Sequence, residues 1–214
     1  MTSSAPTVRF VVREIAQTAV DNEKEFGDLD AVVGDGDFGF SLARGFERVL
    51  EELDGYPEDD PAAFLQAVAM TISSRIGGTS GPIWGTAFLR AAMTAKGRET
   101  LAAEDVVAML RASVTGIQAR GKAELGDKTL LDALVPAIDE LERAAADGDD
   151  SQAIVDRVAA ETRRAAEATS ALQAMRGRAS YSGPRSIGSP DAGAIALAVI
   201  AEHIARRWPD RPAD

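Results

Sequence analysis

Apolar residues recur at intervals of three and four along nearly the whole chain, and no segment alternates apolar and polar residues as a strand does. The spacing predicts eight helices, each begun or ended by glycine, proline, threonine or aspartate. Successive helices with short connections favour antiparallel neighbours, so we expect one all-α domain over residues 1–214. The predicted helices span about 6–26, 40–54, 59–76, 84–96, 100–121, 129–141, 150–165 and 195–203.

Glycines cluster in the connections after the first, third, fifth and seventh predicted helices. In an up-and-down arrangement, the connections after odd-numbered helices all lie at the same end. Residues 29–39, 77–82, 121–128 and 177–193 should therefore meet in space, although they are far apart in the sequence. Their side chains are the first candidates for a functional site.

The first of these connections carries three aspartates, Asp30, Asp35 and Asp37, interspersed with glycines that permit tight turns. Carboxylates repel one another unless a cation lies between them, and hard oxygen ligands suit Mg²⁺, which is usually shared with substrate phosphates. A calcium EF-hand does not fit, because Phe46 stands where the loop's twelfth residue must be glutamate. The alternative is a solvated Asp-Gly turn.

The other connections supply groups that suit an anion. Residues 77–82 form a glycine-rich entrance to a helix, whose free N–H groups favour phosphate. Arginines at 176, 178 and 185 provide positive charge in an otherwise acidic protein. Residues 121–129 look like a phosphate-binding Walker A loop, but Asp127 separates the glycine from the lysine and no strand precedes the loop. Together these features predict a magnesium–nucleotide site.

Composition excludes several other classes. The net charge of −11 argues against nucleic acid or an anionic membrane as a partner. Absence of cysteine rules out disulfides and thiolate chemistry. The one histidine, His203, is expected to be a surface residue near a helix end. Without a signal core or an apolar run long enough to span a bilayer, the chain is expected to be soluble and cytoplasmic.

Seven short motifs follow one another over nearly the full length of the chain. They are Gly34-Asp35-Gly36-Asp37-x-Gly39, Arg44-Gly45-Phe46, Gly77-Gly78-Thr79-Ser80-Gly81-Pro82, Arg120-Gly121-Lys122-Ala123, Gly126-Asp127-Lys128-Thr129, Gly177-Arg178-Ala179-Ser180-Tyr181 and Arg185-Ser186-Ile187-Gly188. In this order they resemble a known family, the nucleotide-binding L subunit of dihydroxyacetone kinase. The resemblance implies a closed up-and-down barrel of eight antiparallel helices with a nucleotide, ADP or ATP, at one end.

The same resemblance implies roles for individual residues. Asp30, Asp35 and Asp37 would hold two Mg²⁺ ions that bridge the nucleotide phosphates, and with Arg178 they form the predicted catalytic set. The residues implied to contact the nucleotide are Phe38, Ser41, Thr79, Ser80, Gly121, Leu130, Arg178, Asp191 and Gly193. The chain departs from the family at Phe38 and Ser189, where histidine is usual, and at Ala192, where proline is usual.

The implied activity is phosphoryl transfer from a magnesium nucleotide to the alcohol of a small ketose, held through a histidine on a separate K subunit. The departures point to a subgroup acting on another ketose, such as four-carbon erythrulose. A phosphotransferase-system M subunit is a further candidate partner. One alternative is a nucleotide sensor that docks on a kinase subunit or regulator without catalysis, and another is a helical scaffold with an incidental acidic loop.

Overall fold

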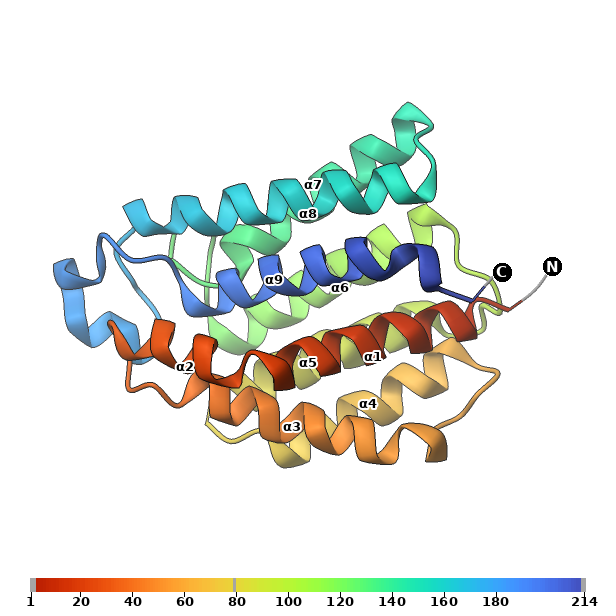
Figure 1. The fold of residues 1–214 in the computed structure, drawn as a ribbon, viewed down its shortest axis with the longest axis horizontal. Coiled ribbons are helices and arrows are strands. Elements are labelled where there is room, and N and C mark those ends of the chain that lie inside the picture. The colour runs from red at the N-terminus through yellow and green to blue at the C-terminus, as the bar shows by residue number, and fades with distance from the viewer. Residues whose placement is uncertain (1–2, 79, 213–214) are drawn as a thin grey trace.

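The structure is a computed structural model that describes residues 3–78 and 80–212, and within these ranges it contains nine α-helices and no strand (Figure 1). The all-α prediction is confirmed. The α-helices are α1 (Ala5–Asp21), α2 (Glu23–Ala31), α3 (Phe38–Glu52), α4 (Pro61–Arg75), α5 (Ser80–Ala95), α6 (Ala103–Gly121), α7 (Leu131–Asp147), α8 (Ser151–Ala168) and α9 (Ala192–Arg207). Short 3₁₀ segments are η1 (Leu53–Gly55), η2 (Thr169–Ala171), η3 (Arg178–Ser186) and η4 (Trp208–Asp210).

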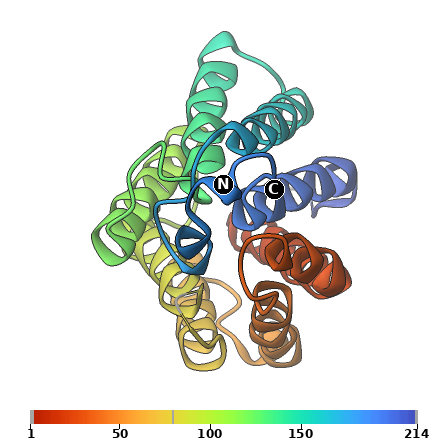
Figure 2. The same ribbon diagram turned by 90° about the vertical axis from the view of Figure 1, so that its left-hand side faces the viewer.

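From α2 onward, helices that follow one another in the sequence pack side by side, and α9 packs back against α1 (Figure 2). The connections α2–α3, α4–α5, α6–α7 and α8–α9 lie at one end of the molecule, on the left in Figure 1. The start of α1 and the end of α9 lie at the opposite end. The predicted gathering of the glycine-rich connections is thus confirmed. Among the described helices, none is long and apolar enough to cross a bilayer.

The first predicted helix, 6–26, is wrong in its extent, because Asn22 divides it into α1 and α2. The Asn22 side-chain amide donates a hydrogen bond to the Thr18 carbonyl at 2.8 Å, a local bond that competes with the helical ladder. Beyond this break the chain is helical again as far as Ala31. Asp30 therefore lies on the last turn of a helix and not in the loop where it was predicted.

Two helix starts follow the predicted aspartate caps, whereas Thr129 is not the N-cap residue of α7 and the helix predicted from residue 100 begins at Ala103. The Asp60 carboxylate accepts the backbone N–H groups of Ala62 and Ala63, and Asp150 accepts that of Ala153. The helix predicted to begin near residue 84 instead begins at Ser80, since Pro82 lies in its first turn, where no N–H donor is needed.

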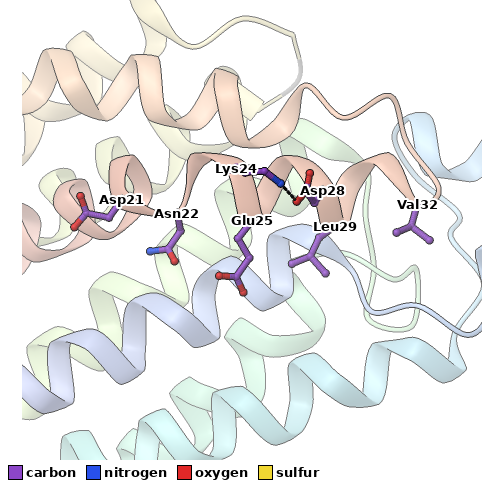
Figure 3. A pocket seen from close by; sticks show the side chains of 7 residues that line it. All are labelled: Asp21, Asn22, Lys24, Glu25, Asp28, Leu29 and Val32. Atoms are coloured by element: carbon purple, nitrogen blue, oxygen red, sulfur yellow. Dashed lines mark hydrogen bonds and ion pairs between the residues drawn. The ribbon is translucent and has the colours of Figure 1, made fainter.

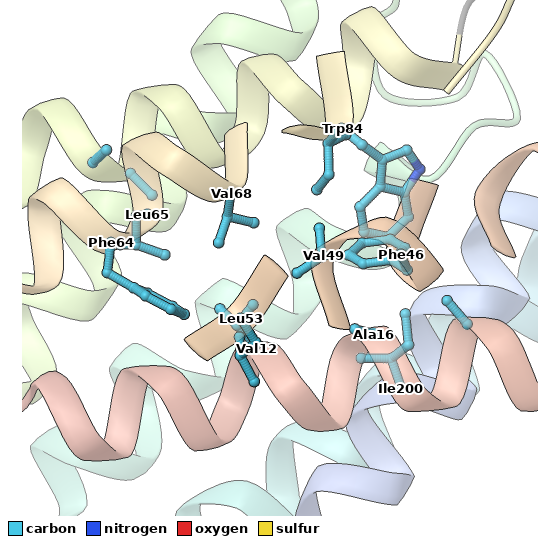
Figure 4. Close-up of a cluster of buried hydrophobic side chains, with 14 of the residues drawn as sticks. Val12, Ala16, Phe46, Val49, Leu53, Phe64, Leu65, Val68, Trp84 and Ile200 are labelled. Atoms are coloured by element: carbon cyan, nitrogen blue, oxygen red, sulfur yellow. The ribbon is translucent and has the colours of Figure 1, made fainter. Parts of the chain in front are cut away.

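The buried apolar residues form three clusters, and two of these differ in composition. Large side chains from α1, α3, α4 and α5, with Ile200 of α9, fill the largest cluster; Val12, Phe46, Phe64 and Val68 are among them (Figure 4). Between α7, α8 and α9 the buried residues are mostly alanines, with one isoleucine, Ile195. Small side chains let these three helices approach closely, as the abundance of alanine suggests.

Gly39 marks the closest approach of α3 to α2, where a Cβ atom would overlap the Glu23 carbonyl oxygen and lie 2.5 Å from the Gly27 nitrogen. We expect Gly39→Ala to destabilise the fold by about 3 kcal/mol through overpacking, which lowers the melting temperature by roughly 10 °C. Thermal unfolding followed by circular dichroism measures this. Gly55→Ala is the matched control, since no atom lies within 4 Å of its added Cβ. Equal melting temperatures for the two variants would contradict the prediction.

Candidate metal and nucleotide site

The loop between α2 and α3 wraps around the Asp30 carboxylate. The Gly34 N–H donates to the Asp30 carbonyl at 2.6 Å, and the Gly36 N–H donates to its Oδ2 at 2.9 Å. A side chain at Gly34 would overlap the Asp30 carboxylate, and Gly36 has a φ of +77°. Glycine is therefore required at both positions, because only a bare backbone fits so close to the carboxylate or takes this conformation freely.

The wrapping brings the three predicted aspartates together. Each of Asp30, Asp35 and Asp37 offers a carboxylate oxygen within 4.8 Å of the others. Asp37 precedes the first residue of α3, but its side chain does not cap that helix. Asp35 and Asp37 are exposed and Asp30 is partly buried, so water or phosphate oxygens can reach the cluster. These residues fit a hard divalent cation such as Mg²⁺, which favours carboxylates together with water and phosphate ligands.

Arg178 is the cation that the fold places against this cluster. Its guanidinium donates to Asp37 Oδ2 at 2.6 Å and also pairs with Asp35 Oδ2. It begins η3, a segment that also contacts the aspartate loop through Ser182, whose hydroxyl donates to the Val33 carbonyl at 2.9 Å. The four residues of the predicted catalytic set, Asp30, Asp35, Asp37 and Arg178, thus lie together.

A second group of predicted residues, Leu130, Asp191 and Gly193, lies where α7 and α9 begin. A Cβ at Gly193 would lie 3.3 Å from the Leu130 Cβ, so glycine lets the two segments touch. The Asp191 carboxylate accepts the Ala194 N–H at 2.8 Å and so caps α9. Burial raises the pKa of Asp191 to about 7, with the charges of Asp132 and Asp30 acting in the same direction.

The remaining predicted nucleotide contacts are less closely gathered. Phe38 turns inward, with its ring centroid 6.3 Å from that of Phe26. Ser41 lies in the first turn of α3, Ser80 begins α5, and Gly121 ends α6 beside Ile83. Thr79 lies outside the described residues.

His203 lies near the end of α9, away from the aspartates, and is partly buried. Its Nε2 is 2.7 Å from the Glu14 carboxylate, between α9 and α1. A hollow of about 480 Å³ lies on the flank of α2, and none of the three aspartates of the cluster lines it. Its lining residues are Asp21, Asn22, Lys24, Glu25, Asp28, Leu29 and Val32 (Figure 3). Paired charges such as Lys24 and Asp28 border this hollow, whereas the converging carboxylates lie at the end of the helices.

Two contributors to the site had no predicted role. Ser182 fastens η3 to the aspartate loop, and Lys128 is buried between the connections α6–α7 and α8–α9. Lys128 belongs to the Gly126–Thr129 motif, so the sequence marks its position. Its burial depends on contacts with residues more than forty positions away, which the local pattern does not reveal.

Comparison with known proteins places this arrangement in a family. Residues 32–206 match the DAK2 domain. The chain is 37% identical over 177 residues to the ADP-binding subunit DhaL of the PEP-dependent dihydroxyacetone kinase of Escherichia coli K12, covering 83% of this chain and 84% of that protein. It is 34% identical over 195 residues to D-erythrulose kinase of Mycolicibacterium smegmatis, covering 89% of this chain and 33% of that protein.

A solved structure shares the fold. The dihydroxyacetone kinase of C. freundii, in complex with AMP-PNP and Mg²⁺, superimposes with a TM-score of 0.76 at 24% identity, over 96% of this chain and 34% of that chain. At that identity the likeness concerns the fold alone. The sequence match covers most of the chain, including Asp35, Asp37 and Arg178. The chain therefore belongs to the DAK2 domain family.

Proposed function

We propose that this chain, as one domain over residues 1–214, is the ADP/ATP- and magnesium-binding subunit of a dihydroxyacetone-type kinase. It transfers phosphoryl to the alcohol of a small ketose held on a separate K subunit. The observation that carries the proposal is the convergence of Asp30, Asp35 and Asp37 with Arg178 at one end of a DAK2 fold. The relatives' names support this substrate class, which includes dihydroxyacetone and four-carbon erythrulose.

The geometry suggests how the chain's residues divide the work. Asp30, Asp35 and Asp37 would hold two Mg²⁺ ions. When bound, these ions would neutralise phosphate charge in the transition state. Arg178 stands beside the carboxylates, where its guanidinium can pair with phosphate oxygens. Ser80, at the N-terminus of α5, adds N–H donors that favour an anion. Positioning and charge neutralisation are the main contributions this subunit makes.

The ring of neighbouring helices supports a finer proposal about the fold. If α1 and α2, separated only by Asn22, count as one interrupted helix, eight antiparallel helices remain. The packing of α9 against α1 then closes them into a barrel. The nucleotide would lie at one mouth of this barrel, over the starts of α3, α5, α7 and α9.

Exposed apolar side chains support a partner at the same end. Six of the nine large apolar side chains that are exposed among the described residues lie on connections or first turns around the aspartates. Such a concentration marks an interaction surface. We propose that the K subunit docks there, and that a phosphotransferase-system M subunit acts on the same complex. The six are Val32, Phe40, Leu125, Met175, Tyr181 and Ile187.

Calorimetric titration of the purified chain with ADP, with and without Mg²⁺, tests the proposal directly. Binding that requires Mg²⁺ is the expected result. No binding under either condition would refute it.

One observation favours a second candidate function, a nucleotide sensor that docks on a kinase subunit or regulator. Phe38 follows the metal aspartates directly, packs on Phe26 and offers no polar atom to a phosphate. A site that binds nucleotide without completing transfer would suit such a sensor. Reconstitution with a K subunit separates the two functions.

We expect Arg178→Ala to weaken magnesium–nucleotide binding by one to two orders of magnitude. Charge-assisted contacts contribute roughly 1.5–3 kcal/mol, and each 1.4 kcal/mol is about tenfold in affinity. Calorimetry with ADP and Mg²⁺ measures the change, and Arg13→Ala, which removes an exposed arginine of α1 away from the aspartates, is the control. A loss below about threefold would count against a phosphate role for Arg178.

A further inference from the structure

The chain between η2 and α9 forms a loop, residues 170–188, whose two sides meet at a narrow neck. The Gly188 N–H donates to the Ser170 carbonyl at 2.8 Å. The Ala174 N–H donates to the Ser186 hydroxyl oxygen at 2.9 Å. Ala174 and Ser186 are buried, whereas the tip of the loop is largely exposed. The neck is therefore a small core of its own, as in other compact surface loops whose ends lie close together.

Lys128 holds both sides of this neck from the α6–α7 connection. Its ammonium donates to the Leu172 carbonyl at 3.2 Å on one side and to the Ser186 carbonyl on the other. Lys128 is only 3% exposed, and the hydrogen bonds of its ammonium go to these two backbone carbonyls. Burial lowers the pKa of Lys128. An ammonium so enclosed does not reach a phosphate in solvent, and its hydrogen bonds fasten backbone instead.

Asp127 strengthens the same attachment. Its carbonyl accepts the Met175 N–H at 3.0 Å, and its carboxylate accepts the Arg176 guanidinium at 2.8 Å. The Glu124 N–H and the Arg176 charge lower the pKa of Asp127, which keeps it ionised. Asp127 and Lys128 thus fix the loop immediately before the residue that reaches the aspartates.

That residue is Arg178. Only Gly177 lies between it and Arg176, and its guanidinium spans from the fixed neck to Asp35 and Asp37. A shift of the neck by an ångström would move Arg178 off both carboxylates, since a charge-assisted hydrogen bond tolerates little change in length. The position of Arg178 therefore depends on the neck that Lys128 closes.

We propose that Lys128 is a positioning residue, which clamps the 170–188 loop so that Arg178 is held at the metal and nucleotide site. The clamp itself is a property of the fold, and its consequence for ligand binding rests on the proposed function. Two experiments keep these apart.

Hydrogen exchange tests the clamp without any ligand. In Lys128→Met, amides in the peptide 172–188 are expected to exchange at least about tenfold faster, while those of α8 do not change. Lys122→Met is the matched control: Lys122 lies in the same connection, also has a positive φ, and is exposed. Ser186→Ala, which removes the Ala174 contact, serves as a second variant where Lys128→Met fails to fold. Exchange equal to wild type in the folded variant would overturn the clamp.

A double-mutant cycle tests the consequence of the clamp for nucleotide binding. Lys128→Met should weaken Mg²⁺–ADP binding by about tenfold in the wild-type background and have little effect in an Arg178→Ala background, because the two residues act through one contact. Equal losses in both backgrounds would overturn the positioning role. If the wild-type chain binds no Mg²⁺–ADP, the proposed function is wrong. The clamp is tested separately: hydrogen exchange at 172–188 that is the same in Lys128→Met as in the wild type would overturn it.

Discussion

Alanine at Asp35 or Asp37 is expected to abolish magnesium-dependent ADP binding while the helical circular dichroism signal persists. Both side chains are exposed, and their contacts with Arg178 lie at the surface, so the fold is expected to survive their removal. Their removal also relieves repulsion among the three carboxylates. The cation would lose one of the three carboxylates proposed to hold it, and a loss of two decades or more in affinity, about 2.8 kcal/mol, is expected.

Calorimetry with ADP in the presence of Mg²⁺ measures this loss. Asp28→Ala is the matched control, because Asp28 is an exposed aspartate of α2 that pairs with Lys24 and lies outside the cluster. It should bind as the wild type does. Undiminished affinity in both the Asp35 and Asp37 variants would remove the metal assignment.

The isolated chain is expected to show no ketose kinase activity, and activity should appear only when a K-type subunit is added with nucleotide and Mg²⁺. The chain has no cysteine, and its one histidine is engaged with Glu14 far from the aspartates. It therefore has no histidine or cysteine at the site that could hold a carbonyl substrate or act as a base near neutral pH.

The assay follows phosphorylation of dihydroxyacetone and erythrulose by the purified chain, with and without the partner. A complex containing Asp37→Ala controls for contaminating kinase. Robust turnover by the chain alone would contradict the two-subunit mechanism. Tight nucleotide binding without turnover, whichever partner is added, would instead favour the sensor.

The meeting of the glycine-rich connections at one end was predictable from the sequence, because it follows from the order of the helices along the chain. Short connections make neighbouring helices antiparallel, so every second connection returns to the same end, whatever the details of packing. Asp35 and Asp37, spaced by glycines within one such connection, and Asp30, on the last turn of the helix before it, were predictable as a cluster for a local reason: carboxylates so close in sequence need a cation or water between them. Capping by Asp60 and Asp150 was equally local.

What could not be predicted depends on contacts between distant residues. The pair formed by Arg178 and Asp37 spans 141 positions, and a sequence pattern places both at one end without showing that they touch. In the sequence, Lys128 looks like an ordinary polar loop residue. Only the structure shows that the 170–188 loop covers it. The break at Asn22 was missed for the opposite reason, since apolar spacing continues across it and only a single side-chain hydrogen bond interrupts the helix.

The start of α1 and the end of α9 lie at the end of the molecule away from the aspartates. A tag or neighbouring domain joined at either side would therefore extend away from the nucleotide and leave the approach to the carboxylates open. For immobilisation or labelling, both termini are suitable attachment points. The exposed apolar surface that includes Tyr181 should be kept free.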